Sequence, residues 1–119
     1  MGGIVMLKKM VLVLIVGLAV TCAGIAKAEA AEVYVGTSPA TGWDCYVLTE
    51  TIRRNNAGTT YVTLKMYTQN GNERYSDYRF WYDPDRDVMR FANDDGYSGI
   101  ANRYETPIEW EMLQVIRNY

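Results

Sequence analysis

The sequence predicts an α+β fold, an antiparallel sheet of five to six strands packed against one C-terminal helix. Between residues 32 and 103, short segments alternate between apolar and polar residues and are separated by turns rich in Gly, Pro, Asn and Asp. From residue 107 onward, apolar residues recur at the three- and four-residue spacing of a helix. Half-buried strands show the two-residue alternation, and amphipathic helices show the three- and four-residue spacing. Residues 32–119 are therefore expected to form a single antiparallel-sheet domain with a helix at 107–118.

The clearest strand is expected at 59–69, where Val62, Leu64 and Met66 alternate with aromatic and polar residues. Asn70-Gly71 then predicts a tight hairpin turn, because both residues tolerate positive φ. The chain is expected to return as a strand over 73–82. Shorter strands are expected at 32–37, 43–50 and 88–92. Residues 53–58, beginning with Arg53 and Arg54, are expected to form a solvated polar connection, and residues 97–103 fit either an edge strand or an ordered loop.

The start of the helix is marked by two signals. Thr106 and Glu109 have the spacing of a capping box, in which each side chain hydrogen-bonds the backbone N–H of the other residue. Pro107 stands at the first helical position, where its missing N–H is not needed. Apolar residues then follow at helical spacing: Ile108, Met112, Val115, Ile116 and Tyr119.

Residues 1–28 have the layout of a secretory signal peptide, with an alternative end at residue 30. Lys8 and Lys9 precede an apolar run, and two A-x-A sites follow at 26–28 and 28–30. An uncleaved anchor is disfavoured because the run, about 17 residues, is at the lower limit for a spanning helix. A lipoprotein anchored through Cys22 is also disfavoured, since Ala19-Val20-Thr21 places β-branched residues where small ones are needed. The chain is accordingly expected to be exported to the periplasm, the cell surface or the medium.

Intact-mass measurement of the exported protein is expected to show a chain that begins at Glu29 or Ala31 and carries no acyl group. The reason is that the A-x-A sites lie directly after the apolar run. A mature species that begins at a diacylated Cys22 would contradict the prediction.

Charge excludes two classes of partner. The chain has 12 basic and 14 acidic residues, and three of the basic ones (Lys8, Lys9 and Lys27) precede the cleavage site. The mature net charge is therefore near −5. Nucleic-acid binding needs a basic face, and so does a polybasic membrane patch. Membrane contact is expected only through the leader, before cleavage.

Catalytic and metal sites are also not expected. The chain contains no histidine, so Cys45 has no imidazole to activate it and is interpreted as a buried apolar filler. Asp83, Asp85 and Asp87 alternate as calcium ligands do, but Val88 occupies the position that requires glycine, and a solvated turn is favoured. Asp94 and Asp95 could act as an acid–base pair, although their neighbours Asn93 and Gly96 favour a turn. No cofactor, metal site or catalytic residue is assigned.

The order of these segments resembles a known family. A strand ending VYVGT, an extended WDCYVLTETI, the hairpin YVTLKMYTQNGNERY, a strand YRFWYD and a helix introduced by PIEW follow one another. This layout is similar to the surface-adhesin-E-like family of small bacterial envelope proteins, over residues 32–119. The resemblance implies a sheet of about six antiparallel strands, one C-terminal helix and a role in host adhesion. The family commonly pairs a cysteine of a late strand with one near the C-terminus, and the corresponding segments here, YRFWYD and QVIRNY, contain none.

The expected function is a non-catalytic binding or adhesion-type module at the bacterial envelope, with a protein as its partner. All ten tyrosines and all three tryptophans follow the leader, and such residues are enriched at interfaces. A candidate binding face consists of Tyr61, Tyr67, Tyr75 and Trp81. One alternative is a structural envelope component whose aromatic residues form the core. A second alternative is a hydrolase that uses carboxylates such as Asp94 and Asp95.

Overall fold

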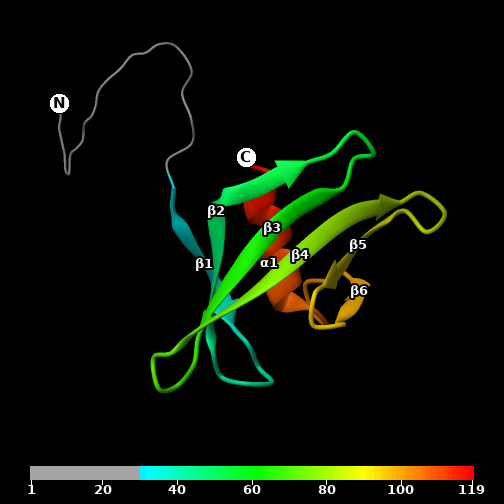
Figure 1. Cartoon of the computed structure of the whole chain (residues 1–119). Coiled ribbons are helices and arrows are strands. Elements are labelled where there is room, and N and C mark those ends of the chain that lie inside the picture. The colour runs from blue at the N-terminus through cyan, green and yellow to red at the C-terminus, as the bar shows by residue number, and fades with distance from the viewer. Residues whose placement is uncertain (1–29) are drawn as a thin grey trace, which may run out of the picture.

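The computed structural model describes residues 30–119; the predicted signal peptide over residues 1–28, with Cys22, lies outside the described residues. The protein folds into a six-stranded antiparallel sheet in which neighbours in sequence are neighbours in space, followed by one helix (Figure 1). The elements are β1 (Glu32–Thr37), β2 (Asp44–Arg54), β3 (Thr60–Tyr67), β4 (Glu73–Asp83), β5 (Val88–Asn93), β6 (Ser98–Ile100) and α1 (Pro107–Ile116). The predicted α+β class is present, with the sheet as its larger part. Within residues 30–119, no helix is long and apolar enough to span a membrane.

The helix lies behind the curled sheet and covers one of its faces (Figure 1). The core between them is built from the inward residues of the strands and from one stripe of α1. Phe80 and Phe91 are completely buried, as is Met112 of the helix. The remaining core residues are Val35, Cys45, Val47, Val62, Leu64, Tyr78, Ala101, Ile108, Leu113 and Ile116.

The predicted alternation in β3 is confirmed. Val62 and Leu64 are buried, whereas Tyr61 is exposed and Thr63 is half-buried on the other face; burial departs from the prediction at Lys65, which is 8% exposed, and at Met66, which is only half-buried. The hairpin after β3 is also present, but its turn is larger than the two-residue form. Thr68 and Asn72 are joined by a backbone hydrogen bond of 2.9 Å, and Gly71 alone of the turn residues has positive φ.

The predicted polar connection at 53–58 is wrong for its first residues. Arg53 and Arg54 belong to β2, which resumes pairing with β3 after a shift of register between Leu48 and Arg53. The backbone of Arg54 pairs with Thr60 of β3, and its guanidinium donates to the backbone oxygens of Ile116, the last residue of α1, and of Tyr119. The Ile116 carbonyl also accepts from the amide of Tyr119 at 3.2 Å, and Arg54 adds a second donor at this end of the helix, as basic side chains near a helix C-terminus commonly do.

The remaining ambiguous segment is resolved as an edge strand. Ser98–Ile100 forms β6 and pairs with β5, with Phe91 opposite Gly99. A Cβ at Gly99 would lie 3.4 Å from the ring of Phe91, an ordinary van der Waals contact, so β6 passes directly over a core aromatic residue.

The capping box predicted from Thr106 and Glu109 is wrong, although the helix does begin at Pro107. The Thr106 hydroxyl donates to the carbonyl of Ile100 at 2.8 Å and accepts from the amide of Asn102 at 2.7 Å. The Glu109 carboxylate points into the core, where the Tyr78 hydroxyl donates to it at 2.6 Å. Tertiary partners therefore replace the local ones. The helix ends at Ile116, two residues before the predicted end.

Cys45 is a buried filler, as predicted: its side chain is 1% exposed and forms no disulfide. Burial raises the pKa of its thiol to about 11. In the native protein at pH 7.5 we therefore expect Cys45 to resist a thiol-alkylating reagent, because the thiolate is the nucleophile. Labelling should become complete on unfolding, and reducing agent should leave the melting temperature unchanged. Rapid labelling of the folded protein, followed by mass spectrometry, would contradict this.

Candidate functional site

The face of the sheet away from α1 carries all four predicted binding residues. Strand register places Tyr61 opposite Arg79, Lys65 opposite Tyr75, and Tyr67 opposite Glu73. Since paired residues of antiparallel strands share a face, these side chains all lie on the side that the helix leaves uncovered. Trp81 follows Arg79 at the two-residue period and lies on the same side. We call this side the open face.

The four residues do not form one cluster. Tyr67 and Tyr75 lie close to Lys65, at the end of β3 near the hairpin. Tyr61 is at the other end of β3, about 20 Å away at the usual rise per strand residue. Tyr75 is 53% exposed and Tyr61 37% exposed, whereas Tyr67 and Trp81 are half-buried.

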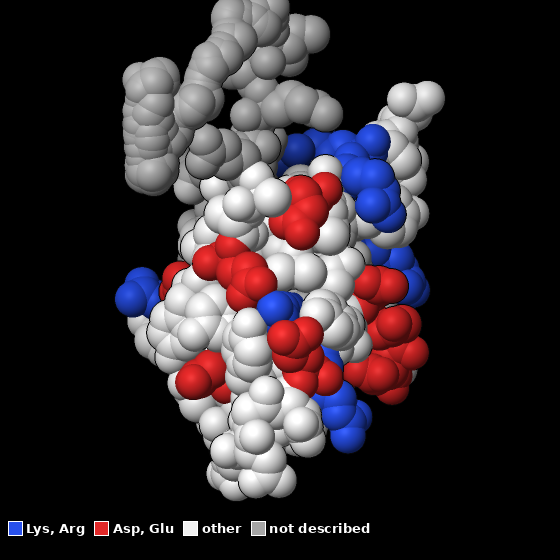
Figure 2. Space-filling model, turned by 60° about the vertical axis from the view of Figure 1, so that its left-hand side comes forward, with Lys and Arg blue, Asp and Glu red and all other residues white. Residues whose placement is uncertain are grey.

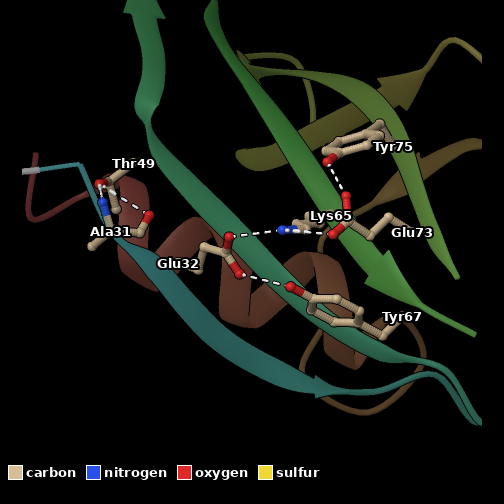
Figure 3. A network of polar contacts seen from close by, with 7 residues as sticks. All are labelled: Ala31, Glu32, Thr49, Lys65, Tyr67, Glu73 and Tyr75. Atoms are coloured by element: carbon tan, nitrogen blue, oxygen red, sulfur yellow. Dashed lines mark hydrogen bonds and ion pairs between the residues drawn. The ribbon is translucent and has the colours of Figure 1, made fainter. Parts of the chain in front are cut away.

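A polar network holds the cluster around Lys65 together, and Figure 3 shows it in front of the sheet with the helix behind. The Lys65 ammonium lies 2.8 Å from a carboxylate oxygen of Glu32 and 3.6 Å from one of Glu73. The Tyr67 hydroxyl donates to Glu32 at 3.3 Å, and the Tyr75 hydroxyl donates to Glu73 at 2.7 Å. Lys65 of β3 therefore holds the carboxylates of β1 and β4 in place, and these carboxylates orient the two tyrosine hydroxyls.

Two charges of this network, on Lys65 and Glu73, are stable to pH. The hydrogen bond to Glu32, then that with Tyr67, raises the pKa of Lys65. The Tyr75 hydroxyl and then Lys65 lower the pKa of Glu73. Both groups therefore stay charged across the ordinary pH range, which suits a fixed recognition surface and does not suit proton transfer.

Two further tyrosines extend the cluster and were missed by sequence reasoning. The rings of Tyr34 and Tyr46 are 5.4 Å apart, and those of Tyr46 and Tyr67 are 5.5 Å apart. Tyr34 is 54% exposed. The available signal was the alternation around Cys45, which places Tyr46 on the face opposite to that buried thiol. We call Tyr34, Tyr46, Tyr67 and Tyr75 the tyrosine cluster.

Charge on the exterior is mixed. Figure 2 shows acidic and basic side chains interspersed among uncharged ones on the face that it views. Elsewhere on the open face, Arg90 donates to Asp83 at 2.6 Å and Thr63 donates to Asp77 at 2.7 Å. The Arg79 guanidinium lies 5.7 Å from the centre of the Trp81 ring.

The acidic turns that sequence singled out are engaged in local contacts. Asp83 accepts from Arg90 and from the amide of Asp85, and Asp87 accepts from the hydroxyl of Tyr82. In the part of the chain that the structure describes, no three His, Cys, Asp or Glu side chains are grouped as a metal would require.

Asp94 and Asp95 both face the hydroxyl of Ser76, at 3.1 and 3.2 Å. Asp94 also accepts from the amide of Asp77, which ties the turn to β4. The two carboxylates thus close the turn onto a neighbouring strand.

A pocket of about 440 Å³ lies on the helix side of the sheet. Its walls come from the loop after β1, from β2, β3 and β4, and from the start of α1, and they are largely apolar; they include Pro39, Ala40, Leu64, Met66 and Ile108. Tyr78, Glu109 and Cys45 also line it. Sequence reasoning missed this pocket because its lining comes from segments far apart in the chain.

One signal for the pocket was present in the sequence. Glu109 lies three, four and seven residues before Met112, Leu113 and Ile116, which are all buried. It is therefore an acidic residue on the buried stripe of the helix, where acids are rare unless paired.

Comparisons with protein-family models, curated proteins and solved structures find no match to this chain.

Proposed function

We propose that this chain is an exported bacterial envelope protein that acts as a non-catalytic binding module, and that its open face contacts a protein partner. The observation that carries the proposal is the tyrosine cluster held on an uncovered sheet face by Lys65, Glu32 and Glu73. The resemblance to surface-adhesin-E-like proteins supports the finer proposal that the partner belongs to a host surface.

Tyrosine suits this role for physical reasons. Its ring supplies a large contact area at low cost in side-chain entropy, and its hydroxyl supplies adaptable hydrogen bonding. In this protein the hydroxyls of Tyr67 and Tyr75 are already oriented by carboxylates, which reduces the ordering required on binding.

The charges of the open face favour a protein over other partners. Lys65 is paired with Glu32 and Glu73, and Arg90 is paired with Asp83. These two cations are therefore not free to neutralise phosphates, and the others on this face, Arg53 and Arg79, are too few for the row of phosphates that nucleic acids require. A protein surface with its own mixed polar groups can complement such a face.

The proposal is tested by placing a photo-crosslinking amino acid at Tyr75 and, separately, at Tyr104, in cells that export the protein. Tyr104 is a matched control because it is an exposed tyrosine, at 79%, in the segment before α1. A crosslinked protein partner is expected from position 75 and not from position 104. The adduct should disappear when Tyr34 and Tyr67 are both replaced by Ala.

Equal crosslinking from both positions would indicate non-specific contact. If neither position gave an adduct in the presence of envelope and host-surface proteins, the chain would be a structural envelope component without a ligand on this face.

A further inference from the structure

The pocket on the helix side contains a buried carboxylate that no cation neutralises. Glu109 is 6% exposed, lines the pocket, and accepts a hydrogen bond from the Tyr78 hydroxyl at 2.6 Å. Within residues 30–119, no lysine or arginine forms an ion pair with it. A buried carboxylate without an opposite charge is costly.

The surroundings of Glu109 act on its charge in opposite directions, and burial, which disfavours the charge, has the largest effect. Burial raises the pKa of its carboxyl, whereas the Tyr78 hydroxyl and its own backbone amide lower it. Glu109 also lies in the first turn of α1, where the helix dipole favours a negative charge. A carboxylate oxygen can accept more than one hydrogen bond, and Tyr78 is its one side-chain partner in the described range.

We propose that the pocket binds a small organic cation, an ammonium group carried on a compact apolar body. The ammonium would donate to the Glu109 carboxylate, and the apolar body would lie against Leu64, Met66 and Ile108. This site is on the opposite side of the sheet from the open face, so it is independent of the protein-binding function proposed above.

The pocket selects this class of ligand over two others. An anion would face Glu109 at close range, and like charges in a site of low polarity repel strongly. A neutral apolar molecule would gain contacts with the walls but would leave the carboxylate without a counter-charge. The volume of about 440 Å³ is in the lower part of the range for small-molecule pockets, about 300–1,000 Å³, which requires a small ligand.

The groups that face Glu109 define the pH dependence. They are Tyr78 of β4, Tyr97 from the turn before β6, and Cys45 of β2; the charge on Glu109 helps to raise the pKa of each, and the carboxylate of Glu105 lines the same pocket from an exposed position. All three are neutral at pH 7. Affinity should therefore rise with pH as Glu109 ionises, and fall again when the ligand amine loses its proton, near pH 10 as for a lysine.

The test titrates the purified protein at pH 7.5 with hexylammonium, with hexan-1-ol and with hexanoate, followed by the backbone amide signals in NMR. Hexylammonium is expected to saturate a single site, with shifts in the amide signals of these pocket residues, which have a backbone N–H: 38, 40, 45, 97, 105, 106, 108 and 109. Hexan-1-ol should bind at least tenfold more weakly, and hexanoate should not bind.

Two variants identify the group responsible. Glu109→Gln should weaken hexylammonium binding at least tenfold and leave hexan-1-ol binding unchanged. The matched control is Glu105→Gln, which removes the same charge from an exposed position lining the same pocket and should change affinity less than threefold. Ala40→Trp, which adds bulk at the exposed mouth of the pocket, should weaken both ligands and keeps the test valid if Glu109→Gln does not fold.

The proposal would be overturned by equal affinity for hexylammonium and hexan-1-ol, or by unchanged hexylammonium affinity in Glu109→Gln. It would also fail if hexylammonium shifted only signals outside the pocket, or if the wild-type protein showed no saturable binding. These results concern the helix side alone, so they can be separated from a failure to crosslink through Tyr75.

Discussion

Ile116→Ala is expected to lower the free energy of unfolding by about 2–5 kcal/mol, the range for truncating a large apolar side chain in a core. Ile116 is 2% exposed and belongs to the same buried stripe of α1 as Met112 and Leu113. A helix of ten residues is marginal by itself in water, so it depends on this packing, and the sheet depends on it for cover. Chemical denaturation of the mature protein would measure the loss.

The neighbouring position supplies the control. Val115 is only half-buried, so Val115→Ala should cost clearly less than Ile116→Ala. Deleting all residues after Glu105 should expose the core residues under the helix, such as Val47 and Leu64, and cause unfolding or aggregation. A truncated chain that stayed monomeric with an unchanged melting temperature would show that α1 contributes nothing to the core.

The parts of the fold that sequence predicted are those that local patterns control. The alternation in β3 and the turn at Gly71 depend on residues next to one another, and both appear in the structure. Pro107 marks the first helical residue, and its effect on the backbone is equally local. These features could be predicted without knowing which elements pack against one another.

The incorrect predictions concern side chains whose hydrogen-bond partners lie far away in the sequence. Glu109 has the right spacing for a capping box, but the hydroxyl of Tyr78, 31 residues away, donates a hydrogen bond to its carboxylate. Arg54 looks like part of a solvated loop, yet its guanidinium donates to backbone oxygens of Ile116, at the end of α1, and of Tyr119. The position of Glu109 on the apolar stripe of the helix indicates a buried acid, but nothing local identifies Tyr78 as its partner or the end of α1 as the partner of Arg54.

The candidate site was likewise predictable only where it depends on local patterns. Alternation correctly placed Tyr61, Tyr67, Tyr75 and Trp81 on one face, because period two needs only the strand itself. Which of them gather depends on register between strands. Lys65 meets Glu32 only through the pairing of β1 with β2 and of β2 with β3, and that pairing brings Tyr34 and Tyr46 into the cluster.

Tyr78→Phe is expected to lower the free energy of unfolding by about 1.5–3 kcal/mol at neutral pH, the range for a hydrogen bond to a charged group. The variant keeps the ring and removes the hydroxyl that donates to Glu109. Burial raises the pKa of the Glu109 carboxyl in the folded protein. In the wild type, this group therefore stabilises the fold most below the unfolded pKa, about 4.3, and the contribution is lost as pH rises through the folded pKa.

The missing hydroxyl should raise that folded pKa further, because the Tyr78 hydrogen bond lowers it. The difference in stability between wild type and Tyr78→Phe should therefore be small at pH 4, where Glu109 is protonated in both proteins, and should grow toward pH 7. Denaturation curves across this range, repeated in the Glu109→Gln background, measure the coupling between the two residues. In that background the cost of Tyr78→Phe should be smaller and independent of pH. A cost that was the same at every pH in the wild-type background would mean that the Tyr78 hydroxyl does not stabilise an ionised carboxylate.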